Sequence, residues 1–451
     1  MIIGITVTII ALVVVSVLSG KAEKNKKGAN SFVVAGAIMG TLVGGSSTIG
    51  TAQLAYQYGM SAWWFTLGGG IACLILALGY AKPFYRSNNT TLMGFLTNEY
   101  GAKTGVLASA LSSLGSFISI ISQLIAATAI IAVVFPQVSF YMSLIFSAFI
   151  MILYMVFGGV KGSGFVGILK MLLLYVSMLS AGLLALYLCG GLPGFFRAVS
   201  IIDNPQNVNF YNLFARGVGK DLGACLSLIL GVITTQSYAQ AIFMAEGEKQ
   251  AVKGALLSAF LVPPIGIGGI LVGLYMRSVH PGIVSKTALT YFVTQYMPPI
   301  LGGIVLGALF IAVVGTGAGL ALGVSSVLKK DVLPMLKYGS KKRGIKEKSL
   351  TVLVLLLACL MSMGPIGDTI LNFSFMSMGL RGAAVFIPLC FAMFLKGRVT
   401  NRYATISVIS GPLTVLVFNL WKVLPFDPLF AGVMVSAIIM LAGMSEKKNK
   451  E

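Results

Sequence analysis

The stretch Gly44-Gly45-Ser46-Ser47-Thr48-Ile49-Gly50 lies near the middle of an apolar run at residues 31–58. That run is longer than the roughly 20 residues with which a helix crosses a lipid bilayer. Glycine and hydroxyl residues in mid-membrane free backbone groups that lipid cannot satisfy, so such a break must face protein or water. The stretch predicts an interior binding site or, as the alternative, close helix packing through small residues.

A second interrupted run occupies residues 221–245 and contains Gly231-Val232-Ile233-Thr234-Thr235-Gln236-Ser237. It comes five apolar segments after the first, and because five is odd the two runs enter the membrane from opposite sides. Two inverted five-helix units, whose broken first helices meet at the bilayer midplane, are typical of secondary transporters. The candidate substrate-binding residues around the two breaks are Ser46, Ser47, Gln53, Tyr56, Thr235, Gln236 and Tyr238.

The composition places the whole chain in the membrane. Of 451 residues, 57% are hydrophobic and 10% are charged, whereas a soluble domain carries about 25% charged residues. We predict an all-α integral membrane protein with about 13 transmembrane helices, arranged as a five-plus-five inverted repeat with one extra helix before it and two after. The apolar runs lie at about 2–19, 31–58, 60–82, 104–134, 137–158, 163–190, 221–245, 249–276, 299–327, 349–364, 366–395, 401–421 and 427–444.

These runs give a simple organisation. The expected parts are an N-terminal transmembrane helix at 1–19, a first repeat at 31–190, a second repeat at 221–396, two C-terminal helices at 401–444 and a cytoplasmic tail at 445–451. The first run has its lysines after the apolar stretch, which is the reverse of a secretory signal. It is therefore expected to be retained.

The basic residues set the orientation. With the N-terminus outside, 24 of the 32 Lys and Arg residues fall on the cytoplasmic side and 6 on the outer side. This asymmetry follows the positive-inside rule and predicts a multi-pass protein of the bacterial cytoplasmic (inner) membrane, with a cytoplasmic C-terminus. The net charge of +20 is then a membrane-surface charge, which argues against a nucleic-acid partner.

The ligands that most enzymes need are scarce. Five cysteines lie in apolar runs without a CxxC pair, there is one histidine, and no Asp or Glu lies deep in a predicted helix. We therefore expect no enzyme activity, no cofactor and no metal other than a coupling ion. The expected partners are a small-molecule solute and membrane lipid, with no obligatory protein partner.

A polar stripe follows the run at 104–134. Ser109, Ser112, Ser116, Ser119 and Gln123 recur at spacings of three and four residues, which is one helix face. Two interpretations fit this stripe: hydrogen bonding between helices, or one wall of a hydrated path. In the second case Ser116 and Gln123 contact the substrate.

Several motifs, in order along nearly the whole chain, resemble those of the sodium:solute symporter family. They are Ser31–Gly36, Gly158–Gly162, Gln240 with its following loop, Ala312–Thr316 with Ser325, Ser326 and Asp331, and the stretch Phe373–Arg398. The resemblance implies a LeuT-like fold with its inverted repeat in segments 2–11. It also implies symport by alternating access, with Na⁺ as the coupling ion.

The resemblance further implies a sodium site between the first break and the run at 299–327. Its ligands would be the backbone carbonyls of Gly45, Thr48 and Ala312 and the hydroxyls at positions 315 and 316. Position 315 is glycine, so one hydroxyl is missing.

The run at 163–190 departs from the family pattern as well. Val166, Gly167 and Lys170 stand where the family has Thr, Asp and Gln. One hypothesis is that the Lys170 ammonium replaces the sodium ion, which leaves a proton or no ion for coupling. The alternatives are that Lys170 snorkels to the cytoplasmic face, or that a sodium site is completed by Thr316 and another residue.

Arg381 lies near the bilayer middle, where an arginine is costly and should face the bundle interior. One interpretation is that its counter-ion is an anionic substrate, because a carboxylate matches the planar guanidinium. The other is pairing with backbone carbonyls near Gly379 and Gly382. The sequence thus favours a secondary active transporter for a small polar organic solute, which is anionic under the first interpretation of Arg381; a transporter-like sensor and a passive channel are the alternatives.

Overall fold

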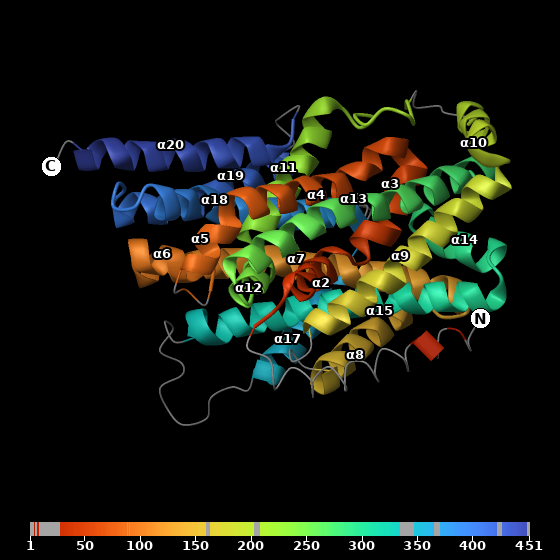
Figure 1. The fold of residues 1–451 in the computed structure, drawn as a ribbon, viewed down its shortest axis with the longest axis horizontal. Coiled ribbons are helices and arrows are strands. Elements are labelled where there is room, and N and C mark those ends of the chain that lie inside the picture. Colours follow the sequence, from red (N-terminus) through yellow and green to blue (C-terminus); the bar gives the residue numbers. More distant parts are fainter. Residues whose placement is uncertain are drawn as a thin grey trace.

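The structure is a computed structural model that describes residue 4, residues 7–8, 28–87, 89, 91–158, 163–202, 208–333, 347–364, 370–421 and 426–448. The predicted N-terminal helix at 1–19, residues 159–162 of one family motif and the end of the predicted tail lie largely outside these ranges. Figure 1 shows long helices running side by side along the long axis, with α10 at one end and the C-terminal end of α20 at the other.

The described helices follow the apolar runs of the sequence. They are α2 (Ser31–Leu42), a π-helical segment (Ser46–Gly50), α3 (Thr51–Tyr58), a 3-10 turn (Gly59–Trp63), α4 (Trp64–Ile75), α5 (Ala81–Arg86), α6 (Met93–Tyr100), α7 (Ala102–Val134), α8 (Phe140–Gly158), α9 (Ser163–Leu188), α10 (Gly191–Ser200), α11 (Val218–Thr234), α12 (Gln236–Phe243), α13 (Glu248–Val279), α14 (Ala288–Tyr296), α15 (Pro299–Val327), α17 (Glu347–Ser362), α18 (Ile370–Phe394), α19 (Asn401–Trp421) and α20 (Pro428–Lys448).

Within the described ranges, eight helical stretches are long and apolar enough to cross a membrane, or nine if the bent pair α11 and α12 is one span. The count of thirteen and the inverted repeat stay predictions. Two features explain part of the difference. The interruption after Leu42 shortens α2 to 12 residues. The stretch Ser46–Arg86 counts as one span although it covers parts of two predicted segments, which meet where α3 ends at Gly59 with a φ of 60°. A Cβ at Gly59 would also collide with the carbonyl oxygen of Phe210, so only glycine fits this turn.

Both interruptions expected in mid-membrane are present. After α2 the chain is extended at Val43 and resumes as the π-helical segment Ser46–Gly50, a geometry that is rare and frequently marks functional sites. Between α11 and α12, Thr235 is extended with φ −95° and ψ 126°, and the two helices meet at 48°.

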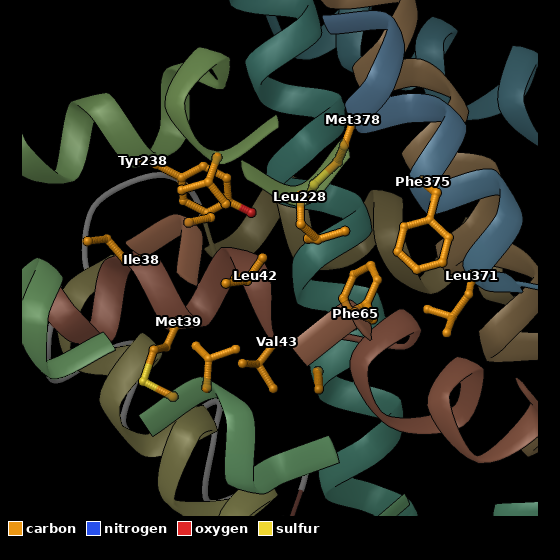
Figure 2. Close-up of a cluster of buried hydrophobic side chains, with 14 of the residues drawn as sticks. Ile38, Met39, Leu42, Val43, Phe65, Leu228, Tyr238, Leu371, Phe375 and Met378 are labelled. Atoms are coloured by element: carbon orange, nitrogen blue, oxygen red, sulfur yellow. The ribbon is translucent and has the colours of Figure 1, made fainter. Parts of the chain in front are cut away.

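Apolar side chains from four directions surround the first break. Figure 2 shows Ile38, Met39, Leu42 and Val43 of the α2 region facing Phe65 of α4, Leu228 of α11, Tyr238 of α12, and Leu371, Phe375 and Met378 of α18. All of these side chains are buried. Burial of this apolar surface fixes the two interrupted helices against α4 and α18.

The ends of the two interrupted helices also meet. The Ala29 amide donates to the carbonyl of Met244 at 2.8 Å, and the Glu246 amide donates to the carbonyl of Ala29 at 2.9 Å. The residue just before α2 is thus paired, backbone to backbone, with the segment just after α12.

Replacing Gly45 by alanine should lower the stability of the fold by about 1–3 kcal/mol, as overpacking of a close contact does. A Cβ at Gly45 would lie 2.5 Å from the Cβ of Ala126 and 3.0 Å from the Cγ2 of Val313, so the first break would have to shift. The measurement is the thermal unfolding midpoint in detergent. Gly79→Ala is the matched control because a Cβ at Gly79 meets nothing within 4 Å; equal midpoints for both variants would contradict the prediction.

Candidate functional site

The side chain of Gln123, from α7, holds the first break. Its Oε1 accepts from the Gly45 amide at 2.9 Å, and its Nε2 donates to the Ser46 hydroxyl at 3.2 Å. Gly44 and Gly45 let α7 and α15 approach this closely, since a Cβ at Gly44 would lie 2.8 Å from Thr316 Oγ1 and 3.0 Å from Gln123 Oε1. The glycines are therefore needed for close approach of three elements at one point.

A set of paired hydroxyls, which we call the serine seam, joins the break, α7 and α18. It consists of Ser46, Ser119, Ser122, Ser374 and Ser377. The Oγ–Oγ distances are 2.5 Å between Ser46 and Ser374, 2.9 Å between Ser122 and Ser374, and 2.7 Å between Ser119 and Ser377. For Ser119, the residue of the polar stripe in this set, the structure shows hydrogen bonding between helices.

The side chain of Lys170, on α9, is directed into the bundle and is 5% exposed. Its Nζ donates to the carbonyl of Gly40 at 2.6 Å and to Thr316 Oγ1 at 2.5 Å. The local sequence explains how the Lys170 side chain reaches the interior of the bundle. Gly167 lies one helical turn before Lys170, and a Cβ at Gly167 would collide with the carbonyl of Gly36. The small residue brings α9 against α2, so that one ammonium group joins α2, α9 and α15, which argues against snorkelling.

The other residues of the implied sodium site lie close by. Thr48 Oγ1 donates to the Gly44 carbonyl at 2.8 Å, and Ala312 is fully buried. A Cβ at Gly315 would lie 3.5 Å from the hydroxyl of Tyr154 on α8, in ordinary contact. The first break and α15 are therefore adjacent, as the resemblance requires, and the Lys170 ammonium contacts one of the two expected hydroxyl positions.

Arg381 of α18 is 1% exposed and reaches the second break. Its Nη1 donates to Thr235 Oγ1 at 2.9 Å and to Ser116 Oγ at 3.5 Å, its Nη2 donates to Ser377 Oγ at 3.1 Å, and its Nε donates to the Ser377 carbonyl at 3.2 Å. Tyr238 is buried within electrostatic range of this guanidinium. In the described part of the chain no ion pair includes Arg381 or Lys170.

Four predicted substrate residues make hydrogen bonds to nearby backbone or loops. Gln236 Oε1 accepts from the Leu92 amide at 2.7 Å, before α6. The Tyr56 hydroxyl donates to the carbonyl of His280 at 2.8 Å, beyond the end of α13. Gln53 Oε1 accepts from the Ile370 amide at 3.0 Å, and Ser47 Oγ accepts from the Gly44 amide at 2.9 Å. These contacts anchor the four side chains, and their contact with a substrate stays a prediction.

Sequence reasoning missed one charged cluster. Arg216 Nη2 lies 2.6 Å from Oδ1 of Asp221, a side chain with no exposed surface. Ser61 Oγ donates to the same Oδ1 at 2.7 Å. Burial raises the pKa of the neighbouring Asp427, and the charge of Arg216 opposes that shift. The signal in the sequence was an Arg five residues before an Asp at the start of a helix. A hydropathy analysis treats these two residues only as charges at the end of a membrane span.

Comparison with known proteins supports a transport role. The model of the sodium:solute symporter family matches residues 26–411. The high affinity choline transporter 1 of Homo sapiens is 25% identical over 415 residues, covering 86% of this chain and 70% of that protein. A sodium/proline symporter of Staphylococcus aureus is 24% identical over 425 residues, covering 87% and 80%.

Solved structures share the fold. A Na⁺-coupled sialic acid symporter, in a substrate-bound outward-open state, superposes with a TM-score of 0.74 at 16% identity, covering 98% of this chain and 96% of that chain. A nucleobase-cation-symport-1 family transporter gives 0.61 at 12% identity, covering 93% and 94%. The protein is thus a multi-pass secondary transporter with LeuT-like neighbours and not an enzyme, and the chain belongs to the sodium:solute symporter family.

Proposed function

We propose that this protein carries a small anionic organic solute across a bacterial cytoplasmic membrane by alternating access, and that its coupling does not use sodium. The observation that carries this proposal is a pair of buried cations, Lys170 and Arg381, that have no carboxylate partner among the described residues. Each lies beside one of the two helix breaks, where transporters of this architecture bind their solutes and ions.

The contacts of Lys170 support a fixed cation in place of Na⁺. Its ammonium carries the same single charge and contacts Thr316, a predicted sodium ligand. A Na⁺ ion placed about 4 Å from it would meet a repulsion of about 4 kcal/mol at an effective dielectric constant near 20. That energy corresponds to roughly a thousandfold loss of Na⁺ affinity. Lys170 and a sodium ion are therefore competitors for this site.

The contacts of Arg381 support an anionic solute. Its neighbours Ser116, Thr235 and Ser377 provide oxygen atoms but no charge. A buried guanidinium without a counter-ion is costly, and a bidentate carboxylate supplies both the charge and the geometry. Hydroxyls can rotate to leave N–H groups free for such a ligand. In this proposal the carboxylate of the solute binds to Arg381 beside the second break.

Uptake into proteoliposomes, with Na⁺ and proton gradients varied independently, tests this function. The probes are labelled acetate, lactate and glutamate, with the corresponding uncharged amides as controls. Wild-type uptake of at least one carboxylate should saturate, show counterflow and be unchanged when N-methylglucamine replaces Na⁺. Lys170→Gln should reduce that uptake because the fixed charge is lost.

The contrary outcomes are distinct. An absolute requirement for Na⁺ in the wild type would overturn the fixed-cation role of Lys170. Uptake of the amides but not of the carboxylates would overturn the anionic solute. Flux that neither saturates nor shows counterflow would favour the passive channel, and saturable binding with no flux would favour the sensor.

A further inference from the structure

Arg216 and Asp221 form a buried ion pair at the end of the bundle that the charge count predicts to face outside. Arg216 Nε donates to Asp221 Oδ1 at 2.8 Å and to Ser61 Oγ at 2.9 Å, and the Arg216 backbone amide donates to Asp221 Oδ2 at 3.2 Å. The Asp221 carboxylate is therefore contacted by four polar groups: Nη2, Nε and the backbone amide of Arg216, and the hydroxyl of Ser61. Separating the two groups while they stay buried would leave two uncompensated charges, which is costly.

The ion pair connects four separate parts of the chain. Arg216 belongs to the segment 208–217, Asp221 to the first turn of α11, and Ser61 to the 3-10 turn before α4. The Arg216 guanidinium also lies over the ring of Phe375 on α18, 5.4 Å from its centroid. Cation–π contact of this kind is favourable within about 6 Å. The pair therefore fastens α4, α11 and α18 together through one loop.

The same loop is tied down at two further points. The Met60 amide donates to the carbonyl of Phe210 at 2.8 Å, and Trp64 Nε1 donates to the carbonyl of Leu213 at 2.7 Å. Both donors flank Ser61 in sequence. The segment 208–217 thus lies across the turn before α4 and is held along its length.

Beneath the ion pair, apolar side chains fill the space down to the first break. Phe65 and Phe375 pack with ring centroids 5.6 Å apart, and Figure 2 shows both beside Leu228, Leu371 and Val43. Val43 is the extended residue of the first break. These side chains lie between Arg216, which contacts Phe375, and the first break, so a solute that entered along this line would have to displace them.

The helix that carries Asp221 also leads to the second break. Thr235, a ligand of Arg381, directly follows the last residue of α11. Fourteen residues at 1.5 Å each separate it from Asp221 by about 21 Å. A rigid tilt of α11 would therefore change the ion pair and the Arg381 site together.

We propose that the Arg216–Asp221 pair is the latch of an outer gate: it holds the segment 208–217, α4 and α18 closed over the Phe65–Phe375 column, and the path to Arg381 opens when Arg216 leaves Asp221 and Phe375. In the open state water solvates both charges, so the latch biases the equilibrium without preventing opening. This inference rests on the proposed transport role, since a gate has a use only in alternating access.

Accessibility of a single engineered cysteine tests the latch without measuring transport. Leu228→Cys is placed in a background in which the five native cysteines are alanine, and the protein is reconstituted in proteoliposomes. A membrane-impermeant maleimide is applied to either face. Asp221→Asn should accelerate labelling about tenfold from the outer face, which corresponds to a shift of about 1.4 kcal/mol in the gate equilibrium, and should not accelerate it from the inner face.

Further variants separate a gate from a damaged fold. Arg216→Gln combined with Asp221→Asn removes both charges of the ion pair and should also open the gate, with an unfolding midpoint no lower than that of Asp221→Asn alone. Glu248→Gln, which removes the exposed pair with Arg86, is the matched control and should leave labelling as in the wild type. Leu371→Cys repeats the measurement from α18.

Three results would overturn the latch: equal labelling in wild type and in both latch variants at the two reporter positions, acceleration from the inner face alone, or acceleration by Glu248→Gln as well. The outcome is separable from that of the proposed function. If the latch variants accelerate labelling but no carboxylate is transported, the latch is supported and the anionic solute is refuted.

Discussion

Arg381→Gln should abolish binding and uptake of an anionic solute while the protein remains folded. Hydrogen bonds to charged groups contribute about 1.5–3 kcal/mol each, so loss of a bidentate carboxylate contact should weaken affinity by about 100-fold or more. Stability should not fall with it. In the ligand-free protein the guanidinium is buried without a carboxylate partner among the described residues, and removing an uncompensated buried charge is neutral or stabilising.

Two measurements together identify this result: the shift of the unfolding midpoint caused by the carboxylate, and the midpoint without ligand. Arg381→Lys keeps the charge but loses the planar fork, and should recover only part of the affinity. Arg402→Gln is the matched control, because that arginine is exposed in the first turn of α19. Uptake by Arg381→Gln at the wild-type rate would refute the assignment.

Lys170→Ala combined with Gly315→Ser should create sodium dependence. Lys170→Ala alone removes the group that joins Gly40 and Thr316 and should abolish uptake. Serine at position 315 restores the hydroxyl that the family pattern contains, and the space allows it, since the nearest neighbours of the Cβ are atoms of the Tyr154 side chain at 3.5–4.0 Å, which is ordinary contact. Oxygen ligands and a vacated charge are what a small cation requires.

The direct measurement is the thermal unfolding midpoint of the double variant in NaCl compared with that in N-methylglucamine chloride. A Na⁺ concentration 100 times the dissociation constant should stabilise it by about 2.7 kcal/mol, with uptake recovering in parallel. Lys170→Ala alone should not respond, and Lys103→Ala, at an exposed lysine, controls for general loss of basic charge. A double variant that Na⁺ leaves unchanged would show that Lys170 does not occupy a cation site.

The sequence predicted the interruptions of the helices better than it predicted the partners of side chains. Glycines and hydroxyl residues in an apolar run are visible locally, and both breaks are present. Lys170, by contrast, bonds to residues 130 and 146 positions away. Which helices lie beside α9 depends on close contacts such as Gly167 against Gly36, and these depend on the packing of the whole bundle.

The direction of a side chain around its helix was equally hard to predict. Gln236 and Tyr56 looked like ligands because they are polar and close to a break in sequence. In the structure they satisfy the Leu92 amide and the His280 carbonyl, since buried backbone groups require partners, and these partners could not be predicted from the sequence. Arg216 and Asp221 were counted only as charges at the end of a membrane span. Hydropathy does not record that the segment 208–217 packs against the start of α11, which follows it.

The serine seam has a mechanical consequence. In each of its pairs either hydroxyl can be the donor, and a hydroxyl can rotate to exchange one acceptor for another. When α7 and α18 slide past each other by a fraction of a turn, a displaced hydroxyl has other acceptors within reach, such as the Ile370 and Gly115 carbonyls that Ser122 and Ser377 already contact. The serine seam thus permits small sliding motions between packed helices. Interdigitated leucine side chains would have to separate before the helices could slide.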